Sequence, residues 1–417
     1  MADEWQGVSV ADIADNVRNA LVGGPFGSNL VSRDYVAAGI PVIRGQNLGH
    51  RWVSGDFVFV TPAKAKTLSA NLAHPGDIVF TQRGTLGQVC IVPAEPFAEY
   101  LVSQSQMKLT VNRKIADPAF YYYVFSASEQ QEYIRQNSIQ TGVPHINLGI
   151  LRAIQVPLPP LSEQRAIARI LGTLDDKIEL NRRMNETLEA MTRALFKSWF
   201  VDFDPVRAQA EGSGSLRAPN FWSLFPGALD PDDRPLGWPL GTLIDLCELK
   251  RGYDLPAAQR LEGPYPIVSS SGVSGFHSSA MAAGPGVVTG RYGTIGEVYF
   301  ISERYWPLNT ALYVRDFKGN SPRFVYYALQ QVEFLQYSDK AAVPGINRNH
   351  LHQAPMVLPP HPVQEAFEKL LTPVWARQEA NKAEIATLTA LRDTLLPKLI
   401  SGELRVKAAE KIVEAVA

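Results

Sequence analysis

The feature that most constrains the fold of this chain is an internal repeat with a spacing of 200 residues. The matching segments are Val143-Pro144 and Val343-Pro344, Ile146-Asn147 and Ile346-Asn347, and Leu158-Pro159-Pro160 and Leu358-Pro359-Pro360. Upstream, Gly84-Thr85-Leu86-Gly87 corresponds to Gly293-Thr294-Ile295-Gly296 at a spacing of 209. Self-similarity over such a distance indicates a tandem duplication of about 200 residues. Each copy consists of a globular part followed by a long helical segment.

The helical segment of the first copy is predicted to form one continuous helix. Residues 161–201 contain no proline, and Gly172 is their only glycine. Ser162 follows an extended proline-rich stretch and is predicted to be the N-cap. At 1.5 Å per residue this helix would be about 55–60 Å long, which exceeds what one domain needs to cover a sheet. We therefore predict two spacer helices, residues 162–200 and 363–396.

Apolar residues recur in both spacer helices at alternating intervals of four and three residues, which predicts a seam between paired helices. The predicted seam residues are Ile167, Leu171, Leu174, Ile178, Leu188 and Leu195 in the first helix, and Phe367, Leu371, Val374, Leu388 and Leu395 in the second. Each globular part precedes its helix, so antiparallel pairing would relate the two copies by an approximate twofold axis. We predict antiparallel pairing.

Two features of these helices leave alternatives open. Asn181 and Asn381 fall on the seams, where they either pair with each other and fix the register or are exposed by a local rotation of the helix. In the second copy, His361-Pro362 replaces the residues that open the first helix, and Pro373 could introduce a kink.

Composition limits the class of protein. The chain has 417 residues, of which 46% are hydrophobic and 19% are charged, which suits a globular protein with two domains. Cys90 and Cys247 occupy unrelated places in the two copies, which indicates a reducing compartment and argues against a disulfide framework. No apolar run approaches 18 residues, and the first residues are acidic, so we expect a cytoplasmic protein without a membrane span. A net charge of −1 means that any nucleic-acid site must be locally positive.

Short β-branched runs that end in polar residues and glycine are typical of strands whose ends carry loops. In the first copy these runs are residues 40–47 and 76–84, followed by a helix at 118–135 and a loop at 140–147. In the second copy they are residues 265–269 and 287–293, followed by a helix at 321–337 and a loop at 342–349. Residues 202–233 are rich in glycine, proline and serine and are predicted to be a linker pinned by Phe221, Trp222 and Phe225.

We therefore predict an α+β fold with two similar globular α/β domains separated by two long antiparallel helices. The predicted boundaries are 1–158 for the first domain, 159–204 for the central helix, 205–358 for the linker and second domain, 359–404 for the C-terminal helix and 405–417 for a tail.

The polar strand ends differ between the copies although their frames agree. Ser269-Ser270-Ser271 stands where the first copy has Arg44-Gly45-Gln46, and Arg291-Tyr292 stands where it has Gln82-Arg83. Similar scaffolds with different side chains at their tips indicate two different ligands of one kind.

The chain resembles the specificity subunits of type I restriction-modification systems over nearly its whole length. The motifs that carry the resemblance are Leu158 to Arg165 (LPPLSEQR), Phe196 to Phe203 (FKSWFVDF) and Leu395 to Val406 (LLPKLISGELRV). The resemblance implies two target-recognition domains that each read one half of a split DNA sequence. It also implies paired helices that set the gap and dock two modification subunits, with restriction subunits as further partners.

The predicted DNA-binding residues are those whose side chains suit base edges, since arginine can grip guanine and glutamine or asparagine can grip adenine with two hydrogen bonds. They are Arg44, Gln46, Asn47, Gln82, Arg83, Ser270, Arg291, Tyr292, Arg348 and Asn349. The alternative for each of them is a solvated loop.

No catalytic site is predicted in this chain. It has no phosphate-binding loop, no His-Glu-x-x-His motif and no Asn/Asp-Pro-Pro-aromatic motif of amino-methyltransferases. We therefore expect no cofactor and no metal here, with S-adenosylmethionine bound by the modification subunit. Asp232 and the later Glu248-Leu249-Lys250 have the spacing of a metal-dependent nuclease core. That pattern is short, begins in the predicted linker and is missing from the other copy, so we attribute it to chance.

Two other classes of function remain open at the level of sequence. One is a stand-alone DNA nuclease or methylase with an unrecognised site, which activity of the isolated chain with Mg²⁺ or S-adenosylmethionine would reveal. The other is an adaptor whose helices space two peptide-binding domains, which sequence-selective DNA binding would exclude.

Overall fold

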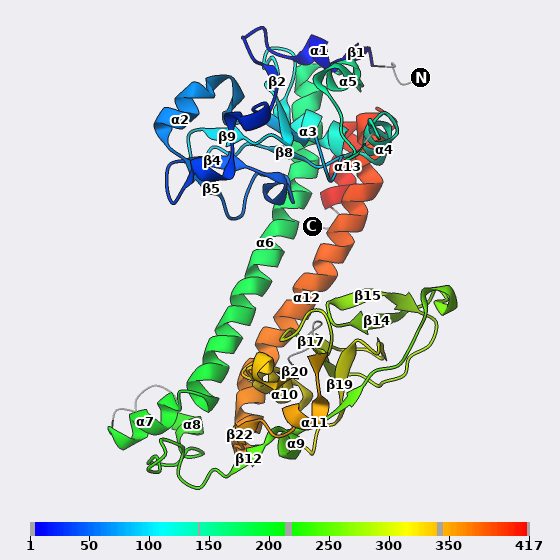
Figure 1. The fold of residues 1–417 in the computed structure, drawn as a ribbon. Coiled ribbons are helices and arrows are strands. Elements are labelled where there is room, and N and C mark those ends of the chain that lie inside the picture. Colours follow the sequence, from blue (N-terminus) through cyan, green and yellow to red (C-terminus); the bar gives the residue numbers. More distant parts are fainter. Residues whose placement is uncertain (1–4, 141, 213–218, 340–344, 415–417) are drawn as a thin grey trace. The chain divides into compact units, whose positions relative to one another are not determined.

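The computed structural model describes residues 5–140, 142–212, 219–339 and 345–414. The chain divides into two compact units (Figure 1). Unit 1 contains residues 1–183 and 381–417, and unit 2 contains residues 184–380. The long helices α6 (Leu161–Phe200) and α12 (His361–Ile400) each contribute one part to each unit. Within the described part of the chain, no helix is long and apolar enough to cross a membrane.

Unit 1 is built from short strands in two larger sheets that lie against helices. One sheet has the order β2-β10-β7-β8 and is antiparallel, and the other has the order β3-β5-β4-β9-β6 with β4 and β9 parallel. Its strands are β1 (Gly7–Ser9), β2 (Leu21–Gly23), β3 (Tyr35–Val36), β4 (Ile40–Ile43), β5 (Val58–Val60), β6 (Leu72–Ala73), β7 (Ile78–Thr81), β8 (Val89–Ile91), β9 (Tyr100–Val102), β10 (Gln106–Leu109) and β11 (Gln155–Pro157). Its other helices are α1 (Val10–Ile13), α2 (Pro62–Thr67), α3 (Pro118–Ser126), α4 (Ser128–Gln136), α5 (Leu148–Ala153) and α13 (Val406–Glu414).

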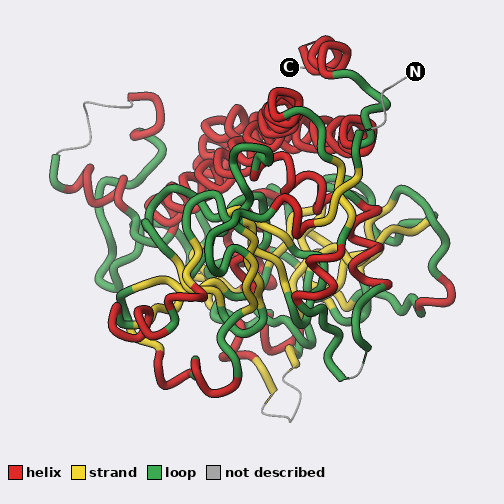
Figure 2. The backbone as a smooth tube through the Cα atoms, turned by 90° about the horizontal axis from the view of Figure 1, so that it is seen from above, coloured by secondary structure: helices red, strands yellow, loops and turns green. Residues whose placement is uncertain are grey.

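Unit 2 repeats this topology. The order β13-β19-β16-β17 reproduces the first sheet of unit 1, and β15-β14-β18 contains the equivalent parallel pair, β14 and β18. Its strands are β12 (Leu240–Thr242), β13 (Glu248–Arg251), β14 (Tyr265–Ser269), β15 (Gly272–His277), β16 (Gly286–Gly290), β17 (Val298–Ile301), β18 (Trp306–Pro307), β19 (Ala311–Asp316), β20 (Ser338–Asp339), β21 (Gly345–Ile346) and β22 (Pro355–Val357). Its other helices are α7 (Asp204–Ala210), α8 (Pro219–Trp222), α9 (Leu243–Leu246), α10 (Pro322–Leu329) and α11 (Arg348–Leu351). The matching sheets confirm the predicted duplication, and Figure 2 shows the many loops that join the strands.

Equivalent turns in the two units have the same backbone requirement. Gly84 and Gly87 have φ values of 103° and 94°, and Gly293 and Gly296 have values of 80° and 94°. These left-handed conformations are accessible to glycine at little cost, which explains why the Gly-Thr-x-Gly turns recur in the sequence.

The helices α6 and α12 run antiparallel within each unit, as predicted. In unit 1, Asn181 Nδ2 donates to Glu384 Oε2 at 2.8 Å and Arg392 Nη1 donates to Asp175 Oδ1 at 2.9 Å. Residue numbers in α12 therefore rise as those in α6 fall. In unit 2 the same order holds, because Asn185 Nδ2 donates to the carbonyl of residue 378 at 3.3 Å and the rings of residues 196 and 367 lie 5.7 Å apart.

The structure buries most of the residues that the periodicity assigned to a seam, with a shift in three places. Ile167, Leu171, Leu174, Ile178, Phe367, Leu371, Leu388 and Leu395 are all buried. Leu188, Leu195 and Val374 are only half-buried, and the neighbouring Trp375 is buried where Val374 was expected. A straight helix drifts about 20° per heptad relative to a strict seven-residue repeat, so one stripe cannot stay central over forty residues.

The alternative that the seam asparagines are exposed is wrong. Asn181 exposes 1% of its surface and Asn381 exposes 0%. The amide of Asn181 is used across the helix pair, since it donates to Glu384. A buried polar residue with such a partner can specify the register of two helices.

The predicted start of the first spacer helix is off by one residue. The helix begins at Leu161, so Ser162 lies inside its first turn and is not the N-cap. The carbonyl of Pro160 accepts hydrogen bonds from the N–H groups of Glu163 and Gln164 at 2.8 and 3.0 Å, which starts the helix before the serine. The second spacer helix also starts earlier than predicted and continues through Pro373.

Three other predicted segments differ from the structure. The predicted helix at 118–135 is two helices, because Ala127 adopts an extended backbone between α3 and α4. In the second copy α10 ends at Leu329, and residues 334–337 form a separate 3-10 helix. The linker contains α7, although its aromatic residues do pin it, with the ring of Phe225 5.0 Å from that of Trp199. Thr141, Val343 and Pro344, and residues 213–218 of the linker, lie outside the described residues.

Candidate nucleic-acid interface

In unit 1 three loops are hydrogen-bonded to residues 103–106, which comprise the turn between β9 and β10 and the first residue of β10. The N–H groups of Gln82 and Arg83 both donate to the carbonyl of Ser105, at 2.7 and 3.3 Å. The N–H of Gly24 donates to the carbonyl of Gln106 at 2.8 Å. The N–H of residue 103 donates to the carbonyl of residue 43 at 3.0 Å, which brings the end of β4 to the same turn. The strand ends that the sequence predicted as tips therefore converge at one place.

The predicted tip residues of unit 1 do not all remain available to a ligand. Gln46 and Arg83 are exposed, while Arg44 and Gln82 are half-buried. Asn47 exposes only 1% of its surface. Its Oδ1 accepts from the N–H of Arg44 at 3.0 Å, and its Nδ2 donates to two carbonyls of residues 54 and 56 at 2.9 and 3.0 Å. Asn47 therefore shapes its own loop, and we assign it to the fold and no longer to DNA contact.

Unit 2 uses the same anchoring scheme at the turn of residues 308–310. The N–H groups of Arg291 and Tyr292 both donate to the carbonyl of Thr310, at 2.9 and 3.1 Å. The carbonyl of Arg291 accepts from the N–H of Ile346 at 2.9 Å, which draws the loop before α11 to the tip. The equivalent bond in unit 1 joins the N–H of residue 146 to the carbonyl of residue 82 at 3.0 Å. The backbone frame of the tips is thus the same in both copies.

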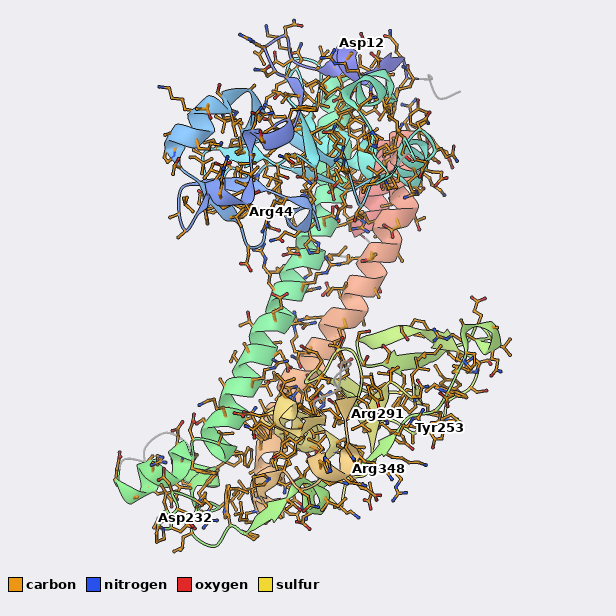
Figure 3. The ribbon with its side chains drawn as sticks, in the orientation of Figure 1. Asp12, Arg44, Asp232, Tyr253, Arg291 and Arg348 are labelled. Carbon is orange, nitrogen blue, oxygen red and sulfur yellow. The ribbon has the colours of Figure 1, made fainter. Side chains whose placement is uncertain are left out.

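The tips of unit 2 surround a pocket of about 340 Å³. Arg251, Arg291 and Arg348 line it together with Tyr292 and Asn349, and none of the lining residues is acidic. The guanidinium of Arg291 lies 4.4 Å from the centre of the Tyr292 ring. Figure 3 shows Arg291 and Arg348 near each other in this unit. Arg251 is paired with Asp254 at 3.8 Å, so the local positive charge of this pocket comes mainly from the guanidinium groups of Arg291 and Arg348.

Ser270, the remaining predicted residue, is half-buried beside this tip. Its Oγ would lie 3.5 Å from a Cβ added to Gly293, so the serine loop packs against the glycine turn. The structure therefore brings together all five predicted residues of unit 2 at one end of the β13-β19-β16-β17 sheet.

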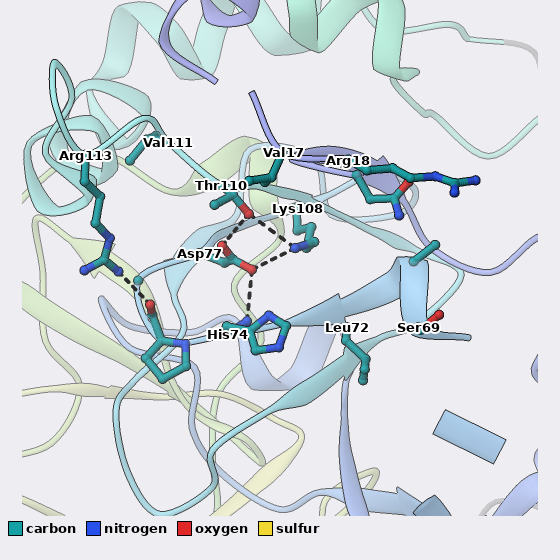
Figure 4. A pocket seen from close by; sticks show the side chains of 14 residues that line it. Val17, Arg18, Ser69, Leu72, His74, Asp77, Lys108, Thr110, Val111 and Arg113 are labelled. Carbon is teal, nitrogen blue, oxygen red and sulfur yellow. Dashed lines mark hydrogen bonds and ion pairs between the residues drawn. The ribbon is translucent and has the colours of Figure 1, made fainter. Parts of the chain in front are cut away.

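Unit 1 also has a pocket, lined in part by Asp77, Lys108 and Thr110, whose polar residues are bonded to one another (Figure 4). Buried Asp77 accepts hydrogen bonds from Lys108 Nζ at 2.9 Å, Thr110 Oγ1 at 2.6 Å and the N–H of His74 at 2.9 Å. Since both carboxylate oxygens are in use and the lysine charge is neutralised, this wall of the pocket serves the fold. We do not place the ligand site there.

The nuclease-like pattern does not form a site. Asp232 is paired with Arg234, and Glu248 is paired with Arg315, so the two carboxylates have separate partners. Within the described ranges, no group of three or more His, Cys, Asp or Glu side chains could hold a metal ion. Both cysteines are free and buried, and burial raises the pKa of each thiol to about 12, which keeps them protonated.

Sequence analysis missed two polar residues at these sites. Arg251 ends β13 and reaches the unit 2 pocket from a strand forty residues before Arg291. Gln104 lies in the anchoring turn of unit 1 and is exposed. The place of Arg251 beside Arg291 follows only from the pairing of β13 and β16 with β19, which joins distant parts of the chain.

The sequence of the chain matches a family model over most of its length. The model describes the type I restriction modification DNA specificity domain and matches twice, at residues 4–190 and 235–390. The chain belongs to the family of type I restriction-modification specificity subunits. The two matches coincide with the two copies of the repeat, so each copy is one specificity domain.

Relatives with known names agree with this assignment. The chain is 23% identical over 431 residues to the MjaIX specificity subunit of Methanocaldococcus jannaschii, covering 97% of this chain and 94% of that protein. It is 25% identical over 399 residues to the HindI specificity subunit of Haemophilus influenzae, covering 79% and 86%. The fold is similar to the crystal structure of a type I S subunit from M. genitalium, with a TM-score of 0.56 at 17% identity, covering 96% and 97% of the two chains.

Proposed function

We propose that this specificity subunit reads a bipartite DNA target, with unit 1 contacting one half-site and unit 2 the other. The observation that carries the proposal is that the two units hold their tips with the same backbone hydrogen bonds but present different side chains. A shared frame suits a shared ligand, the duplex, and different tips suit different base sequences.

The tips are suited to direct readout because their backbones are fastened before any ligand arrives. Arg291, fixed through its own N–H and carbonyl, can present its guanidinium to a guanine with two hydrogen bonds. Gln82, fixed in the same way, can present its amide to an adenine. The other arginines of the unit 2 pocket would contact phosphates or a second base, which adds affinity that depends on salt.

The paired helices are proposed to set the gap between the half-sites and to dock two modification subunits. Methylation, with bound S-adenosylmethionine, belongs in this proposal to the modification subunits, and DNA cleavage belongs to restriction subunits where the system has them. The chain itself contributes recognition and spacing.

The test is to reconstitute the full chain with its modification subunits and to sequence the methylated positions in DNA exposed to the complex. We expect two short specified half-sites separated by a gap of fixed length and free sequence. A single contiguous motif would contradict the proposal.

Two control experiments address the other classes of function. The isolated chain is incubated with DNA and either S-adenosylmethionine or Mg²⁺, and product formation would show a stand-alone enzyme. Failure of the complex to distinguish a target duplex from a scrambled duplex would favour an adaptor that binds peptides.

A further inference from the structure

Phe26 is an unusual residue of unit 1 because its side chain stands almost entirely in water. It is 90% exposed, more than any other large hydrophobic residue that the structure describes, and the next is Leu335 at 74%. Single exposed apolar residues are common on protein surfaces, so exposure alone carries no conclusion. The inference below depends on the loop that carries Phe26 and on the residues beside it.

The loop that carries Phe26 is hydrogen-bonded to the anchoring turn. Gly27 has a φ of +58°, and the Nε2 of Gln104 donates to the carbonyls of Gly27 and Leu30, the latter at 2.8 Å. On the other side, a Cβ added to Gly24 would lie 1.8 Å from the carbonyl oxygen of Ser103, so this backbone is pressed against the anchoring turn. A side chain on such a loop points outward from a fixed base and loses little backbone freedom when it binds.

This loop lies beside the proposed reading tip. The N–H of Gly24 donates to the carbonyl of Gln106. The preceding carbonyl, that of Ser105, accepts from the N–H groups of Gln82 and Arg83. A Cβ added to Gly23 would lie 3.2 Å from the side-chain oxygen of Gln82. Phe26 therefore projects from the loop next to the residues proposed to read the first half-site.

From this geometry we infer that Phe26 is an apolar wedge that enters the DNA at the first half-site and packs against an opened base step. The inference rests on the proposed function, since it needs unit 1 to lie on DNA. Apolar side chains inserted at base steps unstack them partially and kink the duplex, and flexible steps accept them most readily. Phe26 would thus add specificity through deformability, beside the hydrogen bonds of Gln82 and Arg83.

The second unit offers an internal comparison. The N–H of Gly252 donates to the carbonyl of Ala311 at 3.1 Å, as that of Gly24 does to Gln106, so the two loops are equivalent. Two residues after Gly252 the chain has Asp254, where unit 1 has Phe26. A carboxylate would be repelled by the phosphate backbone and cannot act as a wedge. The wedge is therefore restricted to one half-site.

The experiment uses the full chain in complex with its modification subunits and duplexes that carry 2-aminopurine at single positions of either half-site, leaving out the methylated bases and their neighbours, because methyltransferases flip their target base out of the stack. Wild-type complex should raise the fluorescence at one step of the first half-site and at none of the second. Phe26→Ala should abolish that rise and weaken target binding about 5- to 100-fold, whereas Phe26→Trp should preserve both. Leu335→Ala, which removes another exposed apolar side chain, is the matched control and should change neither.

The salt dependence of binding separates a wedge from a misplaced loop. Because Phe26 carries no charge, the slope of log Kd against log salt concentration should be the same for wild type and Phe26→Ala. A slope that falls with the substitution would mean that phosphate contacts were lost, and would overturn the inference. Target binding by Phe26→Ala within twofold of wild type, with unchanged fluorescence, would also overturn it while leaving the proposed function intact. If the wild-type complex does not distinguish its target from a scrambled duplex, both the proposed function and the wedge inference are wrong.

Discussion

Replacement of Arg291 by alanine should relax the target sequence at one base pair of the second half-site and leave the first half-site unchanged. The side chain of Arg291 contacts Tyr292, with its Nη2 3.3 Å from the hydroxyl oxygen and its guanidinium 4.4 Å from the ring centre. Such a cation–π contact contributes about 0.5–1 kcal/mol when partly exposed. The backbone bonds of residue 291 to residues 310 and 346 do not need the side chain. The free energy of unfolding should therefore fall by no more than about 1 kcal/mol.

The cost to recognition should be larger than the cost to stability. A lost two-bond contact to a guanine costs about 1–3 kcal/mol of discrimination, or roughly 5- to 150-fold, at that position alone. Two measurements are needed: the methylated motif, and Kd values for duplexes with each base of the second half-site changed in turn. Arg315→Ala is the control, because Arg315 is an exposed arginine of the same unit that pairs with Glu248 outside the pocket.

Two outcomes would refute this reasoning. If Arg291→Ala weakens binding to all sequences equally and lowers the salt slope by about one, Arg291 contacts a phosphate. If one substitution relaxes both half-sites, the units do not read separately. Tyr292→Phe is a better companion variant than Tyr292→Ala, because a Cβ at Gly345 would lie 2.2 Å from the tyrosine ring, and deleting the ring would unpack that loop.

Four further predictions follow from the structure. Arg83→Ala and Gln82→Ala should relax the first half-site only, as scored by the methylated motif. Seven residues inserted into both helices, after Arg183 and after Ala380, should lengthen the recognised gap by about three base pairs, since they add roughly 10 Å. Insertion of seven residues after Glu189 in α6 alone should instead destabilise unit 2. The reason is that the carboxylate of Glu189 accepts a hydrogen bond from Tyr327 at 3.1 Å and lies 3.4 Å from the amide of Gln378. Asp175→Asn should lower the urea stability of unit 1 by about 2 kcal/mol, since it weakens a largely buried pair with Arg392 and a bond from Tyr123, and an unchanged midpoint would contradict this. Burial, and next the charge of Arg348, lower the pKa of His352 below its ordinary value of 6.5, so the unfolded state binds more protons below that pH. Stability should therefore fall as the pH decreases below 6.5, and His352→Gln should flatten that dependence in thermal melts.

Local patterns were sufficient to predict the architecture of this protein. The period of the apolar residues and the distribution of prolines predicted α6 and α12, and the repeated segments predicted two like units with antiparallel helices. The helices depend on residues close together in the chain, whose periodicity reflects one buried face, and the duplication depends on motifs that recur at a spacing of 200 residues. The errors within them are also local in scale: a break at Ala127, and Trp375 buried in place of Val374.

The composition of the candidate sites was decided by tertiary structure. Asn47 and Gln46 are neighbours with similar side chains, yet one is consumed by its own loop and the other is exposed. Arg251 and Phe26 reach the tips from strands and loops far from Arg291 and Gln82 in sequence, because the register of the sheets brings those strand ends to one turn. Register depends on pairings between distant segments, and it determines which side chains share a surface. The sequence by itself therefore determined the two-unit architecture and the family. Which side chains are available to contact a ligand was decided only by the pairing of the strands.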